Sequence, residues 1–171
     1  AHAVEAAAQN GRASPMDSST CSHGGVVVLS DKIEESIDYR YQRNLLTPGG
    51  KITWHIHGLS IGQQTSDVYL VIGNTGIHAP TAKQVQKVAD LIKQKPEKMN
   101  EIETIGKIAR RGIQALIAGD YEAVGRTMSE NQLMLRSIGV SSPELDALIK
   151  AATPSSLGVK LTGAGGGGCM V

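Results

Sequence analysis

The residues best suited to chemistry lie near the end of the chain, in the segment Lys160-Leu-Thr-Gly-Ala-Gly-Gly-Gly-Gly-Cys169. Glycine has no Cβ, so successive backbone N–H groups in such a run can point at one spot and bind phosphate oxygens. The alternative, from glycine content alone, is a tight or flexible link between two strands. The segment is not a Walker A loop, because Lys160 precedes the glycines and no Gly-Lys-Ser/Thr sequence follows them.

Asp17 is a second candidate for chemistry. It follows Ser14-Pro15, a pair that predicts a helix start with Ser14 as the N-cap and Pro15 as the first helical residue. A carboxylate in the first turn of a helix is favoured in its ionised form by the helix dipole, which suits a base. The alternative is that Asp17 only complements the dipole, and that Ser14 is only a cap.

The elements that position these residues can be predicted from hydrophobic periodicity. Residues 1–9 predict an Ala-rich helix. Strands are expected at 26–29, 51–57 and 68–72, the last fully buried, with a turn at Pro48-Gly49-Gly50. Helices are expected at 81–95, 97–118, 121–138 and from Ser142-Pro143 onward, and a strand at 159–161 leads into the glycines. Strands followed by a run of helices predict an α+β fold.

Composition narrows the functional classes. The chain has 171 residues, is 40% hydrophobic and 19% charged, and carries a net charge of +1. This balance suits a globular protein, and it predicts neither a nucleic-acid partner nor a membrane partner. Two cysteines, Cys21 and Cys169, do not make a disulfide framework, so a cytoplasmic location is expected. We expect Cys21 to be a small buried residue.

A pair of histidines is a candidate metal site with a simpler explanation. His55 and His57 share one face of a predicted strand and could suit a metal, but with no third ligand nearby we expect surface or packing roles.

The sequence begins without Met inside a helical pattern and stops where a strand has just begun. We therefore expect the chain to be a piece of a longer protein.

The full glycine segment closely resembles the third conserved motif of the mevalonate kinases, within the GHMP kinase superfamily. Three further stretches resemble that family in the same order. Gly11-Arg-Ala-Ser-Pro-Met-Asp17 is similar to its catalytic-aspartate segment, Val71-Ile-Gly-Asn-Thr75 with Pro80-Thr81 to the start of its second domain, and residues 125–140, with Asn131-Gln132, to its "MNxNQxxLxxLGV" helix. The resemblance covers most of the chain apart from residues 30–66.

The resemblance implies a reaction and roles for particular residues. Members transfer the γ-phosphoryl group of ATP to the primary hydroxyl of mevalonate, with Mg²⁺, giving 5-phosphomevalonate. Asp17 matches the general base and Glu5 the magnesium-binding carboxylate, although Glu5 could also be an ordinary solvated charge. Thr81 matches a mevalonate-contacting Thr, and Ser14 could also contact the substrate. The phosphate loop corresponds to Gly163, Ala164, Gly165, Gly166, Gly167 and Gly168.

The resemblance also implies an organisation in two domains. Residues 1–66 correspond to the end of the first domain and residues 67–171 to most of the second. The family's Gly/Ser-rich nucleotide loop and a base-assisting Lys are not in this sequence, so we expect these residues alone to be inactive. Members are commonly homodimers. The alternatives are another GHMP member, such as phosphomevalonate kinase or diphosphomevalonate decarboxylase, and a non-catalytic ligand-binding module of the same fold.

Overall fold

The computed structural model describes residues 1–9, 11, 13–47, 50–61 and 67–171. The chain divides into two compact units, Ala1–Ile61 and Gly62–Val171. The first unit holds a sheet with two helices and the second is mainly helical, so the α+β prediction is confirmed. Part of the predicted turn, Pro48 and Gly49, lies outside the described residues. Residues 62–66 also lie outside the described residues. The predicted domain boundary, between residues 66 and 67, falls beside them and stays a prediction.

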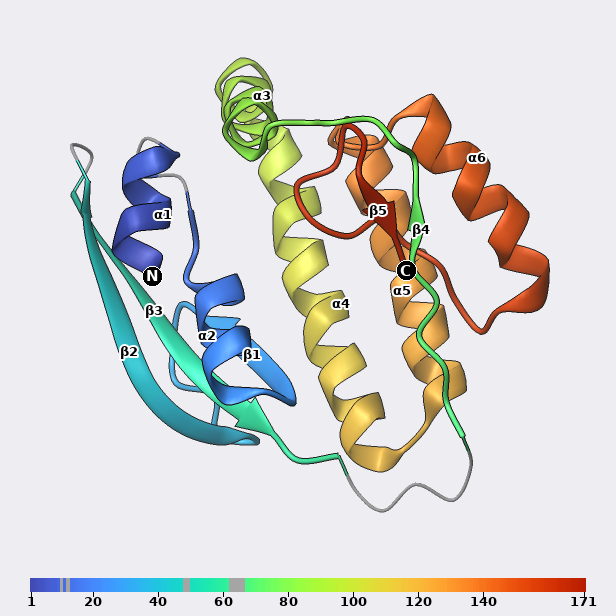
Figure 1. Ribbon diagram of the computed structural model, residues 1–171, viewed down its shortest axis with the longest axis horizontal. Coiled ribbons are helices and arrows are strands. Elements are labelled where there is room, and N and C mark those ends of the chain that lie inside the picture. Colours follow the sequence, from blue (N-terminus) through green and yellow to red (C-terminus); the bar gives the residue numbers. More distant parts are fainter. Residues whose placement is uncertain (10, 12, 48–49, 62–66) are drawn as a thin grey trace. The chain divides into compact units, whose positions relative to one another are not determined.

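A three-stranded antiparallel sheet organises the first unit (Figure 1). Its order is β1 (Val26–Ser30), β3 (Gly50–Leu59), β2 (Asp38–Thr47). The strands predicted at 26–29 and 51–57 are confirmed, although β1 is only half-buried. Strand β2 was not among the predicted strands. Most of its side chains are exposed, including the large apolar Tyr39 and Leu46.

Helices α1 (His2–Ala8) and α2 (Met16–His23) pack on one face of this sheet through polar and aromatic contacts. The imidazole of His2 meets the Trp54 ring edge-on, with centroids 5.5 Å apart. The Tyr41 hydroxyl donates a hydrogen bond of 3.2 Å to the buried Ser19 hydroxyl. The His2 contact fixes which side of α1 faces the strands, and the Ser19 contact does the same for α2.

The start of α2 differs from the prediction. The fully buried Pro15, not Ser14, is the N-cap, because its carbonyl accepts the first helical hydrogen bond from the Ser19 amide at 2.9 Å. No side chain caps the helix, so the prediction of a Ser14 cap was wrong. Cys21 on the same helix is exposed, which corrects the expectation of a buried thiol.

Four helices build most of the second unit, and the predicted helical periods are confirmed. They are α3 (Thr81–Gln94), α4 (Met99–Ala118), α5 (Tyr121–Ser137) and α6 (Pro143–Ala152), with short 3₁₀ turns at Pro96–Lys98 and Thr153–Ser155. Gly119 ends α4 in the left-handed conformation, with φ of 70°. Ser142 caps α6 as predicted, since its hydroxyl accepts a hydrogen bond from the Leu145 amide.

The core of the second unit lies where α5, α6 and the end of the chain meet. Its buried side chains are Ile138, Val140, Leu145, Val159, Leu161 and Met170. The sheet beside it is small: β4 (Gly73–Asn74) pairs antiparallel with β5 (Cys169–Met170). The predicted strand at 159–161 is reduced to one bridge, between Leu161 and Met170. No helix in the described ranges has the length and apolar character needed to cross a membrane.

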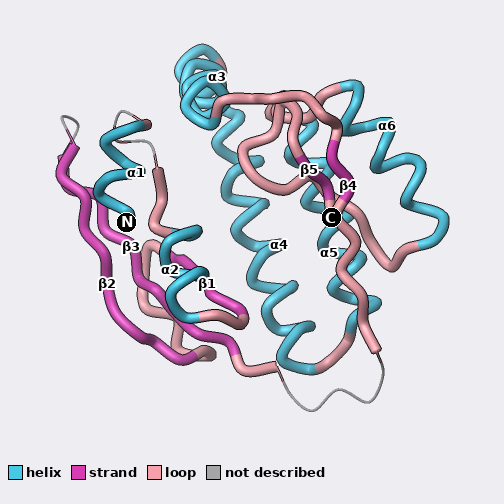
Figure 2. The backbone as a smooth tube through the Cα atoms, in the orientation of Figure 1, coloured by secondary structure: helices cyan, strands magenta, loops and turns pink. Residues whose placement is uncertain are grey.

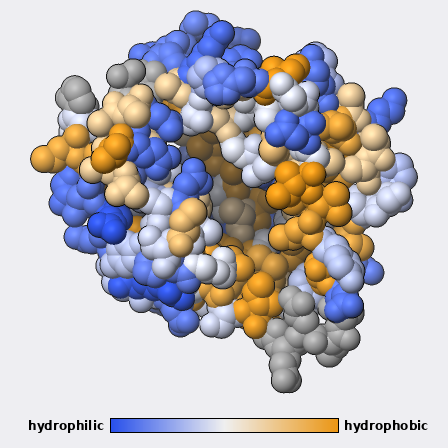
Figure 3. All heavy atoms as spheres, in the orientation of Figure 1, coloured by the Kyte–Doolittle hydropathy of each residue, from blue (hydrophilic) through white to orange (hydrophobic). Residues whose placement is uncertain are grey.

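The expectation of a fully buried strand at 68–72 was wrong. The segment forms no strand and is drawn as loop in Figure 2. Tyr69 and Leu70 are 81% and 79% exposed, and Val71 and Ile72 are also exposed. Figure 3 shows apolar side chains gathered over the stretch that leads into β4. A strand needs neighbours on its edges to be buried, and within the described residues none pairs with 68–72.

The contrast between Leu145 and Leu70 gives a stability prediction. Leu145 is completely buried, so Leu145→Ala should lower the free energy of unfolding by about 2–5 kcal/mol. The same change at the exposed Leu70 should alter it by no more than about 0.5 kcal/mol. Urea unfolding followed by circular dichroism measures both. Equal losses for the two variants would contradict this account of the core.

Candidate functional site

The glycine segment forms a turn between Leu161 and β5 that is closed at its base and bonded to two other parts of the second unit. Thr162 N donates to Cys169 O at 2.9 Å, which closes the turn at its base. Gly166 N donates to Val140 O at 2.7 Å, and Gly168 N donates to Ile77 O at 2.9 Å. The turn is therefore anchored to its own strand, to the α5–α6 connection and to the segment that leads into α3.

Glycine is required in this turn for two reasons. Five of its residues have positive φ, between 73° and 155°: Gly163, Gly165, Gly166, Gly167 and Gly168. Three of these are also packed tightly: a Cβ would collide with the Val140 carbonyl at Gly165, with the Gln84 side chain at Gly166 and with the Ile77 carbonyl at Gly167. The run of glycines thus permits close approach of the neighbouring backbone as well as the fold of the turn.

The hydrogen bonds divide the backbone donors of the turn into two sets. The amides of Gly166 and Gly168 are used by the protein itself. The amides of Gly163, Ala164, Gly165 and Gly167 have no hydrogen-bond partner among the residues that the structure describes. Gly163 is exposed and Ala164 is half-buried, so the first part of the turn offers its donors to solvent. Such free amides are suited to bind anions.

The N-terminus of α3 lies beside this turn. Thr81 is exposed and is the first residue of the helix, and Gln84, one turn further on, has its side chain against Gly166. The N-terminus of a helix carries a partial positive charge, which favours an anion nearby. The structure therefore places Thr81 and the glycine turn in one neighbourhood of the second unit.

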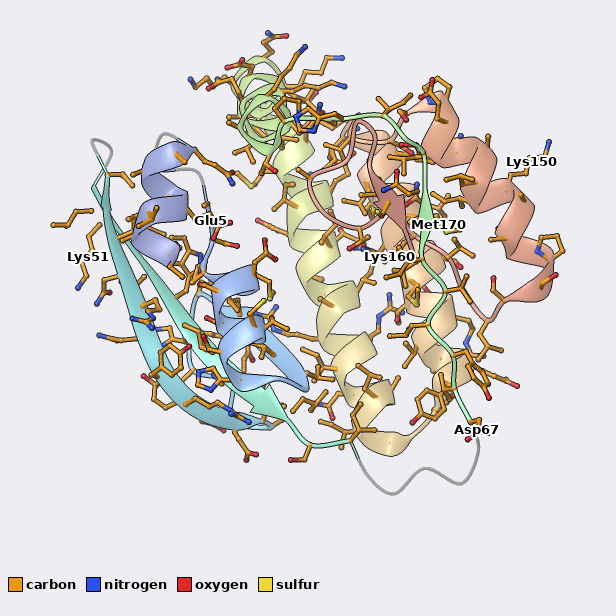
Figure 4. The ribbon with its side chains drawn as sticks, viewed as in Figure 1. Glu5, Lys51, Asp67, Lys150, Lys160 and Met170 are labelled. Carbon is orange, nitrogen blue, oxygen red and sulfur yellow. The ribbon has the colours of Figure 1, made fainter. Side chains whose placement is uncertain are left out.

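Lys160 precedes the turn and is partly buried. Its Nζ donates to the Leu161 carbonyl at 2.7 Å, and its backbone pairs in both directions with Val171. Lys160 and Met170 therefore lie on adjacent extended segments (Figure 4). Burial lowers the pKa of the Lys160 ammonium below its ordinary value, because the charged form loses hydration.

The other predicted site residues lie in the first unit. Asp17 is in the first turn of α2 and is exposed, whereas Ser19, two residues later, is buried against the sheet. Ser14 is exposed just before the helix. Glu5 is half-buried on α1, on the side turned away from β2 and β3 (Figure 4). The structure leaves these three polar side chains off the face that packs on the strands.

The histidine pair is not arranged as a metal site. His57 is fully buried, and its Nε2 accepts a hydrogen bond of 3.1 Å from the Glu34 amide. A neutral ring that accepts at Nε2 carries its hydrogen on Nδ1, which then cannot bind a metal. Among the described residues no group of three or more His, Cys, Asp or Glu side chains could hold a metal ion. A packing role for His57 is the one that the structure supports.

Comparison with known proteins assigns the family. Residues 113–171, which include α5, α6 and the glycine turn, match the family described as GHMP kinases C terminal. The whole chain is 31% identical to the mevalonate kinase of Methanothermobacter thermautotrophicus, and 90 residues are 41% identical to that of Archaeoglobus fulgidus. The chain belongs to the GHMP kinase family.

Solved structures support this assignment. The L. major mevalonate kinase in complex with R-mevalonate matches 74% of this chain and 38% of that chain, with a TM-score of 0.63 and 30% identity. The Lin0012 protein from Listeria innocua matches with a TM-score of 0.60 at 22% identity, which supports the fold alone. The chain spans 48% of the length of the Methanothermobacter protein, and the 90 residues that match the Archaeoglobus protein span 31% of its length, so the chain corresponds to part of a GHMP kinase.

Three residues beside the glycine turn were given no role in the sequence analysis. Gln84 packs on Gly166, Gln132 bonds to the backbone just before the turn, and Lys160 is partly buried beside it. Gln132 stands in a stretch that resembles a family motif, but nothing in its spacing indicates a contact 29 residues further along the chain. Lys160 is adjacent to the glycines, and this adjacency was a signal that could have been used.

Two substitutions in the turn should distinguish the stability cost of a strained backbone from the cost of a steric collision. Gly163→Ala and Gly165→Ala both place Ala at φ near 80°, which costs about 1–2 kcal/mol of stability. A Cβ at Gly163 meets open space, whereas at Gly165 it collides with the Val140 carbonyl. Gly165→Ala should therefore cost about 1–3 kcal/mol more. Denaturant unfolding of the pair measures the difference, and equal losses would show that the collision is absent.

The buried ammonium predicts a dependence of stability on pH. Because the folded state lowers the pKa of Lys160, the unfolded chain holds that proton more tightly. The free energy of unfolding of the wild type, relative to Lys160→Met, should rise as the pH increases through the folded pKa toward 10.5. Lys150→Met, at an exposed position of α6, controls for the lost charge. A constant difference between wild type and Lys160→Met across the alkaline range would contradict the prediction.

Proposed function

We propose that this chain is part of an ATP-dependent kinase that phosphorylates the primary hydroxyl of mevalonate and gives 5-phosphomevalonate. The observation that supports this most strongly is the glycine turn, whose amides at 163, 164, 165 and 167 have no partner among the described residues. Phosphoryl transfer depends mainly on positioning and on stabilising charge on phosphate oxygens, and such amides serve both purposes. The relatives named mevalonate kinase supply the acceptor in the proposal.

Asp17 is the proposed general base. It is an exposed carboxylate in the first turn of α2, where it can accept the hydroxyl proton of an acceptor. Ser14 and Thr81 are proposed to bind the acceptor, and both are exposed. The exposure of Ser14, together with the absence of a cap hydrogen bond, leaves its hydroxyl available for this role.

Glu5 is proposed to hold Mg²⁺ together with the phosphates of ATP. Magnesium is commonly bound through one or two carboxylates, with phosphates and water as the remaining ligands, so the single half-buried Glu5 fits. The ion would neutralise charge on the phosphate oxygens. We propose a cytoplasmic homodimer as the working form, and neither a nucleic acid nor a membrane as a partner.

We further propose that residues 1–171 do not carry out the reaction by themselves. The sequence contains no Gly/Ser-rich nucleotide loop of the kind that the family uses, and the chain spans about half the length of the archaeal protein that it matches over its whole length. Mevalonate phosphorylation by the purified 171-residue chain would contradict this.

The catalytic proposal is tested by the transfer of labelled γ-phosphate from ATP, using a longer protein that contains these residues. Mevalonate, 5-phosphomevalonate and 5-diphosphomevalonate are offered separately as acceptors. We expect transfer to mevalonate, and Asp17→Asn should lower kcat by about 10²–10⁴-fold with folding unchanged. Asp38→Asn, on the exposed edge of β2, is the matched control and should retain activity.

Each other result has a defined meaning. Exclusive use of a phosphorylated acceptor would contradict the assignment of mevalonate as the substrate and would indicate another GHMP enzyme. Binding of ATP and mevalonate by calorimetry without turnover would indicate a non-catalytic module. Full activity in Asp17→Asn would remove Asp17 from the mechanism.

A further inference from the structure

A buried amide side chain connects helix α5 to the backbone just before the glycine turn. Gln132 is 4% exposed, and its Oε1 accepts a hydrogen bond of 2.9 Å from the amide of Leu161. A backbone N–H can only donate, so this contact fixes the orientation of the side-chain amide. Its Nε2 is then directed to the Ser141 hydroxyl, at 3.2 Å. Both ends of the Gln132 amide are therefore used.

The hydrogen bonds continue from Ser141 to the surface. The Ser141 hydroxyl donates to Asp146 Oδ1 at 2.7 Å, and Asp146 Oδ2 pairs with the guanidinium of Arg136 at 3.2 Å. Because Ser141 uses its only hydrogen on Asp146, it can accept from Gln132 without conflict. Each donor has one acceptor along this path, so the network holds one arrangement.

The α5–α6 connection holds the glycine turn at a second point. The carbonyl of Val140 accepts from the amide of Gly166, and the Val140 backbone lies against Gly165. Ser141, the next residue, reaches Leu161 through Gln132. Adjacent residues of one connection therefore fix the chain both before the turn and in its middle.

We propose that Gln132 is a positioning residue that sets the geometry of the glycine turn for binding phosphate. It acts through Leu161 and Ser141, and it does not itself contact the phosphate. The phosphate part of this inference rests on the proposed function, whereas the geometric part rests on the hydrogen bonds alone.

A role limited to packing makes a different prediction from a positioning role. Methionine has nearly the volume and flexibility of glutamine, so Gln132→Met preserves packing while it removes both hydrogen bonds. The Leu161 amide is then left buried without an acceptor, and the turn loses its connection to Ser141. Gln132→Glu keeps an acceptor for Leu161 but loses the donor to Ser141, so it should protect that amide better than Gln132→Met does and less well than the wild type.

The first test is amide hydrogen exchange of the ¹⁵N-labelled 171-residue chain. In Gln132→Met the Leu161 amide should exchange about tenfold or more faster, and the Gly166 amide should also accelerate, relative to amides in the middle of α4. Gln94→Met makes the same chemical change at an exposed position of α3 and should leave both amides unchanged. Leu148→Ala, a partly buried core position, reports what general loss of stability does.

The second test uses inorganic triphosphate with Mg²⁺ as the probe, titrated into the same labelled chains. Gln132→Met should weaken binding about fivefold or more, and Gln132→Glu and Gln94→Met should stay closer to the wild type. Ser141→Ala removes the middle of the network and should accelerate Leu161 exchange even if Gln132→Met folds poorly.

The outcomes separate the two claims. Unchanged exchange at Leu161, or acceleration spread over the whole unit as in Leu148→Ala, would overturn the positioning role. Failure of the wild type to bind triphosphate would count against the proposed function and overturn the phosphate part of the inference. The exchange data would then still decide whether Gln132 orders the turn.

Discussion

The candidate site depends on two backbone hydrogen bonds, from Gly166 to the Val140 carbonyl and from Gly168 to the Ile77 carbonyl. These bonds use the amides of Gly166 and Gly168, which alternate in the latter part of the turn with amides that have no partner among the described residues. They hold the turn against two segments that are distant in the sequence. Glycine at the neighbouring positions permits these bonds, because a Cβ on Gly165 would collide with the Val140 carbonyl and a Cβ on Gly167 with the Ile77 carbonyl. The amides that remain free are presented by a turn that is already ordered, which reduces the cost of ordering it around a ligand.

The rest of the second unit can be understood as support for this arrangement. The core side chains Val140, Leu145 and Leu161 place the α5–α6 connection beside the residue that begins the turn. Gly125 and Gly158 lie in backbone contact, and a Cβ on either would collide with the other segment. The segment that follows α6 therefore packs closely against α5, where the Leu161 amide donates a hydrogen bond to Gln132.

Local signals in the sequence predicted the helices well. The periodic apolar residues, Gly119 and the Ser142-Pro143 start define α3 to α6 without tertiary information. Signals that depend on distant partners were less reliable. The apolar stretch 68–72 has the composition of a buried strand, but burial requires a neighbour that composition does not report. The start of α2 was misplaced by one residue because the burial of Pro15 is decided by tertiary packing.

The site was predictable to a similar extent. The glycine run predicted a turn whose backbone requires glycine, and its positive φ values confirm this, whereas phosphate binding stays a prediction. The division of its amides into bonded and free donors could not be predicted, because the acceptors on Val140 and Ile77 are brought there only by the fold. The role of Gln132 was hidden for the same reason, since its partner Leu161 is distant in sequence.

The central claim is that the glycine turn is an ordered anion site with its first amides free. The most direct measurement is a titration of the ¹⁵N-labelled wild-type chain with MgATP, followed by amide chemical shifts. The account predicts that Gly163 and Ala164 shift most, while the amides of Gly166 and Gly168 stay protected from exchange throughout. Shifts confined to other parts of the chain, or rapid exchange at Gly166 and Gly168 in the free protein, would contradict it.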